Sequence, residues 1–340
     1  GVALPLETSP FRPAWWLPGP HAQTLWPHLC RPRPRIMTTP ERLELADGDF
    51  IDLAHGDGPA AAPRVLLLHG LEGSLHSQYA RGMTAALSRS GLRPVFMHWR
   101  GCSGEPNRLP RSYHSGATDD IARVVAHLRA QEPETPLAAI GWSLGGNALL
   151  KWLGETGSAN PLAAAAAISV PFRLERAAAR MDRGFSRLYQ WRLVGELRRS
   201  LEAKRRLRGL ELPEPPRGGF RAFDDAVTAP LHGYRDANDY YARASSRPWL
   251  GRITVPTRIL HAVDDPFMDP GAIPTARELP PAVTVELARR GGHVGFVEGA
   301  LPGRPRYYAE HRIPAWLKGQ LSLQDPDSAA LKAGYPYSSI

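Results

Sequence analysis

The segment Gly141-Trp142-Ser143-Leu144-Gly145 places a serine between glycines, at the junction of an apolar run and a helical pattern. A strand that turns sharply into a helix leaves little room beside the serine, which explains the flanking glycines. The serine would lie at a helix N-terminus, where backbone N–H groups face negative charge that develops on a substrate oxygen. The motif predicts a nucleophile at Ser143, and the alternative is a glycine turn that only begins a helix.

A serine hydroxyl needs a general base, and the candidate is His293. It follows two glycines after the last apolar run, on a loop that could reach a serine far away in the sequence. The carboxylate that orients the imidazole should follow the preceding strand. We favour Asp265, which comes three residues after the small residue that ends this strand. Asp264 is the alternative, and Asp269 is a weaker third candidate.

A second apolar run leads into His69-Gly70-Leu71-Glu72-Gly73. A turn at this place would present a backbone N–H to the oxygen of a bound acyl group. We therefore assign the two oxyanion donors to the N–H groups of Leu71 and Leu144. We expect His69 to organise the turn, and the alternative for the whole segment is an ordinary β-turn.

Continuous apolar runs predict strands that are buried on both faces of a sheet. They fall at residues 65–68, 94–99, 137–142, 163–170, 257–263 and 283–287, and helical patterns occupy 78–90, 117–130, 144–153 and 271–279. Alternation of strands and helices predicts an α/β fold with a mostly parallel central sheet flanked by helices. The alternating segment 42–55, around Asp47-Gly48, predicts a hairpin.

The remaining segments complete the predicted organisation. Residues 1–40 predict an extended N-terminal arm whose aromatic side chains pack on the sheet, with an acyl-pocket lining as the alternative. Residues 41–171 and 249–320 form the core, residues 172–248 form an inserted helical lid, and 321–340 form a polar C-terminal tail. We expect apolar side chains of the lid to line an acyl site, namely Phe172, Phe185, Leu188, Tyr189 and Trp191.

Composition limits the classes of protein that need considering. The 340 residues are 43% hydrophobic and 22% charged, which is ordinary for a globular chain. Cys30 and Cys102 are too few for a disulfide framework, so a reducing, cytoplasmic setting is expected. We predict neither a signal peptide nor a membrane span. The net charge is +9, and residues 173–221 hold 14 Lys or Arg against 6 Asp or Glu.

Together these motifs resemble the α/β-hydrolase superfamily, and more closely its YheT-like branch, which is related to the ABHD lipid hydrolases. The resemblance is carried by WWLPGPHAQTLWP (15–27), LLHGLEGSLHSQY (67–79), MHWRGCSGEPNRLPRSYHSGATDDI (97–121), GWSLGGNALLKWLGE (141–155), DDPF (264–267) and GGHVGF (291–296). It implies a serine at Ser143, a histidine at His293 and an acid in the Asp264-Asp265 pair. It also implies hydrolysis of short- to medium-chain carboxylic esters without a metal or organic cofactor.

Other functions stay open at this stage. Another acceptor in place of water would give an acyltransferase, and the basic lid could hold a lipid hydrolase on an anionic membrane. A non-catalytic binding protein on the same scaffold is a further alternative. The spacing from His114 to Asp119 occurs in some acyltransferases, but we expect these residues to be structural. Nucleic acid is not an expected partner because no recognition motif accompanies the basic stretch, and the oligomeric state is open.

Overall fold

The computed structural model describes residues 5–323, and in this range nine strands form one sheet. They are β1 (Leu6–Thr8), β2 (Thr38–Glu44), β3 (Phe50–Gly56), β4 (Arg64–Leu68), β5 (Arg93–Met97), β6 (Leu137–Trp142), β7 (Ala164–Ile168), β8 (Thr257–Ala262) and β9 (Val283–Ala288). Their order is β1-β9-β8-β7-β6-β4-β5-β3-β2. Neighbours are parallel from β1 to β5, whereas β3 runs antiparallel to β5 and to β2. The predicted mostly parallel sheet is confirmed.

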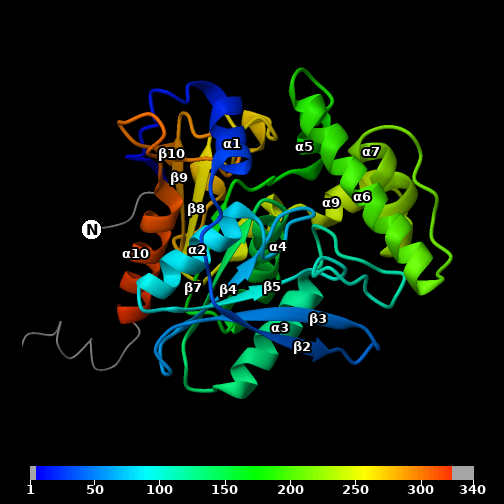
Figure 1. Cartoon of the computed structure of the whole chain (residues 1–340), viewed down its shortest axis with the longest axis horizontal. Helices are drawn as coiled ribbons and strands as arrows, with labels where there is room; N and C mark the ends of the chain where they lie inside the picture. Colours follow the sequence, from blue (N-terminus) through cyan, green and yellow to red (C-terminus); the bar gives the residue numbers. More distant parts are fainter. Residues whose placement is uncertain (1–4, 324–340) are drawn as a thin grey trace, which may run out of the picture.

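Helices cover both faces of this sheet, as the apolar runs of the strands require. Side chains alternate along β4, so Val65 and Leu67 pack on one face, with α2 (Gln78–Arg89) and α10 (Tyr308–Leu323). Leu66 and Leu68 pack on the other face, with α3 (Thr118–Gln131) and α4 (Leu144–Thr156). In Figure 1, α2 and α10 lie on the left of the molecule and α3 lies at the bottom.

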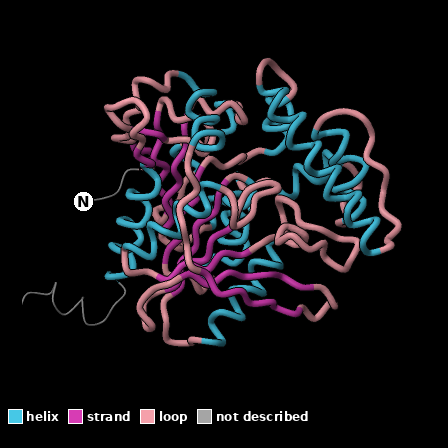
Figure 2. Tube along the Cα trace, in the orientation of Figure 1, coloured by secondary structure: helices cyan, strands magenta, loops and turns pink. Residues whose placement is uncertain are grey.

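Residues 172–248, which we call the insertion, separate β7 from β8. They contain α5 (Leu174–Met181), α6 (Ser186–Arg208), α7 (Phe220–Phe223), α8 (Ala229–Leu231) and α9 (Ala237–Ala244). Figures 1 and 2 show these helices as a group on the right of the molecule, at one end of the twisted sheet. The long helix α6 ends at Gly209, whose φ of +65° gives the left-handed cap that glycine favours.

The N-terminal segment differs from its prediction. Residues 19–30, which we expected to be extended, form α1 (Gly19–Cys30), and β1 adds an edge strand beside β9. Trp16 and Trp26 pack edge to face at 4.8 Å and form a small cluster with Val297 of β10 (Val297–Glu298). That strand pairs with β11 (Arg306–Tyr307) outside the main sheet, so these aromatic side chains pack beside the main sheet rather than on it.

Two further predictions need correction. The helix expected at 271–279 is wrong, because this stretch holds only short 3₁₀ turns at Pro270–Ala272 and Ala276–Glu278. Pro274 lies between them, and proline both lacks an N–H and disfavours a helical conformation in the residue before it. The predicted tail begins inside α10, and its residues from 324 onward lie outside the described residues. No helix among residues 5–323 is long and apolar enough to cross a bilayer.

Candidate active site

Ser143 lies in the turn between β6 and α4, with φ +50° and ψ −117°. This conformation is strained for a residue with a side chain, and it persists only where the surroundings fix it. Here the Ser143 N–H donates to the carbonyl of Ile168 at 2.9 Å. A Cβ on Gly141 would lie 2.6 Å from the carbonyl oxygen of Gly145, and one on Gly145 would lie 2.5 Å from that of His69. Glycine at both places lets strand and helix approach closely enough to hold the turn.

Two backbone N–H groups are available close to this serine. Leu144 is the first residue of α4, where helical N–H groups have no partner within the helix. Within residues 5–323, neither its N–H nor that of Leu71 donates a hydrogen bond to the protein. Glu72, with φ +53°, holds the Leu71 turn in place because its N–H donates to the hydroxyl of Tyr113 at 2.7 Å. Both free N–H groups belong to residues that line the same cavity as Ser143.

His69 has a structural environment. It is completely buried, and its Nε2 accepts a hydrogen bond from the N–H of Trp99 at 3.0 Å. The proton is therefore on Nδ1, which donates to the carbonyl of Gly70 at 2.7 Å. Burial lowers the pKa of His69 to about 3, so the ring stays neutral. It ties β4 to the residues after β5 and leaves no ring nitrogen for a substrate.

The structure brings His293 together with Asp265. His293 Nδ1 lies 2.8 Å from Asp265 Oδ2, and the other carboxylate oxygen accepts the N–H of Phe267 at 2.8 Å. Asp265 is 3% exposed, so this pair is shielded from water. The ring of Phe267 stacks on the imidazole, with centroids 3.9 Å apart and planes within 6°. Two contacts thus fix the orientation of the imidazole, one polar and one aromatic.

The other two candidate carboxylates have different partners. Asp264 Oδ1 accepts the N–H groups of Gly291 and Gly292, at 3.0 and 2.9 Å. Burial raises the pKa of Asp264, and these two N–H donors act in the opposite direction. Asp269 forms an ion pair with Arg176 at 2.6 Å. Asp264 therefore holds the loop that carries the histidine, and of the three carboxylates only Asp265 contacts the histidine ring.

The loop of His293 lies beside the Ser143 turn at the end of β7. The N–H of Val294 donates to Ser169 Oγ at 2.9 Å, one residue from the carbonyl that receives the Ser143 N–H. On its other side, the His293 N–H donates to Thr24 Oγ1 of α1 at 2.9 Å. No hydrogen bond joins the Ser143 hydroxyl to the His293 ring in the described part of the chain. The contact of α1 with this loop, through Thr24, was missed by the sequence reasoning.

A cavity of about 350 Å³ opens next to Ser143, between the core and the insertion. On the core side it is bounded by the Leu71 turn, Leu144 and Phe267. On the side of the insertion the lining is largely apolar and includes Leu193, Leu197, Leu201, Phe220, Phe223 and Val227. The lining also includes polar side chains away from Ser143, among them Lys204, Asp224 and Tyr240, but its largely apolar character suits a molecule with a hydrocarbon part.

The side chains expected to line an acyl site lie elsewhere, so that prediction is wrong. Phe172 is completely buried in the core beneath the insertion. Phe185, Leu188 and Trp191 face solvent. Tyr189 turns toward α1, where its hydroxyl lies 3.0 Å from Nδ1 of His21. The correct lining lies on another face of α6, where leucines recur every four residues at 193, 197 and 201.

The remaining motif residues belong to structural networks. His114 is buried and accepts the N–H of Gly116, while Asp119 pairs with Arg111 and Arg123. His114 and Asp119 are therefore not partners in the structure. Arg100, which opens the glycine-rich segment after β5, is buried among three aspartates, Asp47, Asp49 and Asp120.

This arrangement matches a known family. A family model for the alpha/beta hydrolase fold matches residues 63–300. The chain belongs to the α/β-hydrolase family. Within this family, the chain is 45% identical over 313 residues to YheT of Escherichia coli strain K12, which is provisionally named an esterase. The matched residues make up 89% of this chain and 92% of YheT. The recognition of an α/β-hydrolase of the YheT-like branch is confirmed.

More distant members of the family share the fold. Phospholipase ABHD3 of the mouse is 32% identical over 317 residues, which span 89% of this chain and 77% of the phospholipase. Among solved structures, the esterase Pf2001 of Pyrococcus furiosus superposes with a TM-score of 0.56 at 15% identity, covering 94% of this α/β-hydrolase and 99% of Pf2001. At that identity the superposition supports the fold alone.

Proposed function

We propose that this α/β-hydrolase is a serine hydrolase that cleaves carboxylic esters, with short- to medium-chain acyl groups, through an acyl-enzyme on Ser143. The observation that carries the proposal is the 2.8 Å contact between His293 Nδ1 and Asp265 Oδ2, on a loop beside the strained Ser143 turn. A buried carboxylate in this position selects the imidazole tautomer that a serine nucleophile needs.

In the acylation step, Ser143 Oγ attacks the ester carbonyl carbon and a new C–O bond forms. The hydroxyl proton passes to His293 Nε2, which has a free lone pair because the proton of the neutral ring is on Nδ1 and faces Asp265. The negative charge that develops on the carbonyl oxygen is met by the N–H groups of Leu71 and Leu144. The bond to the alkoxy group then breaks, and this group takes the proton from Nε2 and leaves as an alcohol.

Deacylation repeats these steps with water. His293 Nε2 accepts a proton from the water as its oxygen attacks the acyl carbon, and Ser143 Oγ regains a proton when the acid leaves. The hydrogen bond between Ser143 and His293 forms as substrate binds, since catalytic hydrogen bonds often tighten only in the substrate complex. The insertion acts as a lid, because its apolar side chains cover the cavity.

Two observations support the ester class and the substrate size. The similarity to the provisional esterase YheT extends over nearly the whole of both chains. The cavity volume of about 350 Å³ lies at the lower end of the range for small-molecule sites, which fits a short or medium acyl group. A lipid ester is the second candidate, favoured by the similarity to a phospholipase and by the apolar lining.

The test combines labelling of the serine with a series of substrates. A fluorophosphonate probe should label the parent chain and leave Ser143→Ala unlabelled. Hydrolysis of p-nitrophenyl esters from acetate to palmitate should peak at short or medium chains and fall at least about 1000-fold in Ser143→Ala. Equal hydrolysis by both chains would refute the proposal, and an optimum at palmitate would select the lipid ester. Transfer of the acyl group to an added alcohol would identify an acyltransferase.

A further inference from the structure

Helix α6 presents large apolar side chains to solvent at its N-terminal end. Phe185, Leu188 and Trp191 are 45%, 57% and 78% exposed, although one side of the Phe185 ring packs against His21 of α1, with ring centroids 4.4 Å apart. Their spacing of three residues puts them along one side of the helix. We call these three residues the docking surface. A cluster of exposed apolar side chains, unlike a single one, indicates contact with a partner or a membrane.

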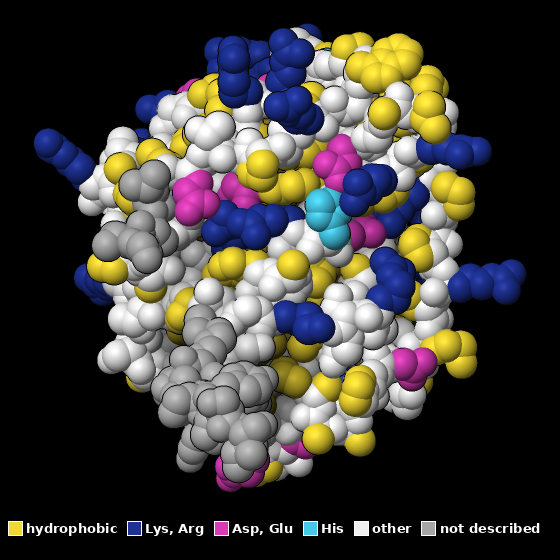
Figure 3. Space-filling model, turned by 90° about the vertical axis from the view of Figure 1, so that its left-hand side faces the viewer, with side chains coloured by type: hydrophobic (Ala, Val, Ile, Leu, Met, Phe, Trp, Pro, Cys, Tyr) yellow, Lys and Arg dark blue, Asp and Glu magenta, His cyan; other side chains and the backbone are white. Residues whose placement is uncertain are grey.

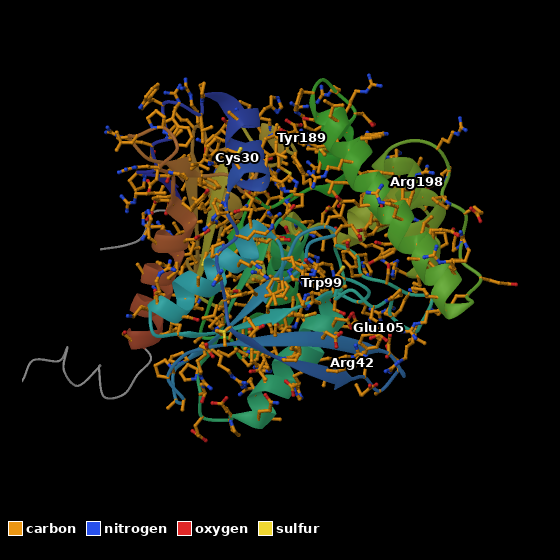
Figure 4. The ribbon with its side chains drawn as sticks, viewed as in Figure 1. Cys30, Arg42, Trp99, Glu105, Tyr189 and Arg198 are labelled. Atoms are coloured by element: carbon orange, nitrogen blue, oxygen red, sulfur yellow. The ribbon has the colours of Figure 1, made fainter. Side chains whose placement is uncertain are left out.

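Positive charge exceeds negative charge around the docking surface. Residues 182–206 include eight Lys or Arg against one Asp and two Glu, and two of the cations, Arg192 and Arg205, form ion pairs. Arg183 and Arg187 lie on either side of Phe185, both are exposed, and neither forms an ion pair within the described residues. Farther along α6, Arg198 is also without an ion pair in this range (Figure 4). Guanidinium groups bind phosphate well, and tryptophan favours the boundary between lipid headgroups and acyl chains.

A row of aromatic rings connects the docking surface with the candidate active site. The ring of Phe185 lies 5.5 Å from that of Tyr189, which lies 5.0 Å from Phe267. Phe267 in turn stacks on His293 and lines the cavity. Figure 4 shows Tyr189 on the side of the insertion that faces α1. The docking surface and the imidazole of His293 therefore lie on the same side of the molecule, next to the cavity.

We propose that the docking surface binds anionic lipid membranes and that ester substrates enter the cavity from this interface. The part that concerns substrates rests on the proposed function. The combination of apolar and cationic side chains favours a membrane over other partners. A symmetric contact with a second copy of the chain would place two cationic surfaces against each other. A nucleic acid would offer no apolar surface to the side chain of Leu188. On the face turned away from the insertion, basic side chains lie among acidic and apolar ones (Figure 3).

Membrane binding is tested with the Ser143→Ala chain and vesicles of phosphatidylcholine, alone or mixed with phosphatidylglycerol. We expect cosedimentation with the mixed vesicles that weakens at high salt. Arg183→Gln/Arg187→Gln should lower the partition coefficient about 30-fold, and Leu188→Ser/Trp191→Ser should lower it about tenfold or more. The matched controls are Arg89→Gln/Arg129→Gln, at exposed ends of α2 and α3, and Met37→Ser, a 75% exposed methionine before β2. These controls should bind like the parent.

The same variants, with Ser143 restored, separate this inference from the proposed function. Hydrolysis of soluble p-nitrophenyl butyrate should be unchanged, which also shows that the variants are folded. Hydrolysis of an ester embedded in mixed vesicles should fall with the partition coefficient. Salt-independent binding, equal binding to phosphatidylcholine alone, or a dimer or nucleic-acid complex that needs Leu188 and Trp191 would overturn the inference. Loss of the serine dependence on butyrate would instead overturn the proposed function.

Discussion

The substitution Asp265→Asn removes a charge while it keeps the shape of the side chain. One carboxylate oxygen of Asp265 accepts the N–H of Phe267 at 2.8 Å, so the amide oxygen of an asparagine must stay on that side. The amide NH₂ would then face His293 Nδ1, and it can only donate. The ring would have to accept at Nδ1 and carry its proton on Nε2, where it could no longer take the proton of Ser143.

The expected loss follows from this change of tautomer. A serine hydrolase whose imidazole is held in the wrong tautomer loses about 10⁴-fold in kcat, or roughly 5 kcal/mol of transition-state stabilisation. We expect Asp265→Asn to lower kcat for p-nitrophenyl butyrate by about 10³ to 10⁴ near neutral pH. KM and the thermal unfolding midpoint should change little, because every hydrogen bond of the side chain keeps a partner.

Asp264→Asn is the matched control. Asp264 uses a single oxygen to accept the N–H groups of Gly291 and Gly292, and an amide oxygen can accept both. We therefore expect less than about a tenfold loss of kcat. If Asp264→Asn proved as damaging as Asp265→Asn, or if Asp265→Asn kept a tenth or more of the activity, the assignment of the acid would be refuted.

Three other substitutions test the surroundings of the site. Gly145→Ala should prevent stable folding or lower the unfolding midpoint strongly, since its Cβ would lie 2.5 Å from the carbonyl oxygen of His69; a midpoint like that of the parent contradicts this. Burial raises the pKa of Asp224 from 3.8 to about 6, so the folded chain binds more protons than the unfolded chain between these values, and stability falls as pH rises through this window. We expect Asp224→Asn to reduce this fall in the free energy of unfolding by up to about 3 kcal/mol. Denaturant unfolding at several pH values measures the change, and the same pH dependence in variant and parent would contradict the raised pKa of Asp224. Leu197→Trp should fill part of the cavity and shift the optimum of p-nitrophenyl ester hydrolysis to shorter chains, whereas Leu188→Trp, on the solvent side of α6, should not; equal profiles would show that this cavity does not hold the acyl group.

Much of the core could be predicted because its strands have a local signature. Strands buried on both faces must be continuously apolar, and the runs at 65–68, 137–142 and 257–263 coincide with β4, β6 and β8. The helix predicted at 271–279 does not form because Pro274 interrupts this stretch, which holds only two short 3₁₀ turns. Helix α1 was not predicted because its prolines at 20 and 27 suggested an extended chain. Pro20 lies in the first turn, where proline is well tolerated, whereas α1 continues through Pro27 in its interior.

The candidate site residues could be nominated from the ends of strands, because parallel strands bring their carboxyl ends to one edge of the sheet. The position of a strand end does not distinguish between the roles of two neighbouring carboxylates. Asp264 and Asp265 differ by one residue, and only the contacts of the folded chain give one to the loop backbone and the other to the imidazole. The roles of Glu72 and Thr24 were also beyond reach, since each depends on a partner from a distant segment.

The lining of the cavity shows most clearly where the sequence was ambiguous. Helix α6 has apolar side chains on two of its faces, one with Leu188 and Trp191 and the other with Leu197 and its neighbours. Periodicity alone cannot tell which face packs inward when both are apolar. The polar anchors decide it: Ser200 donates to Glu72 beside the oxyanion turn, and Lys204 donates to two carbonyls of the 110–111 segment. These two polar residues lie on the same side of α6 as Leu197, so the face with Leu188 and Trp191 is exposed to solvent. That face belongs to the docking surface for which we propose an anionic membrane as the partner.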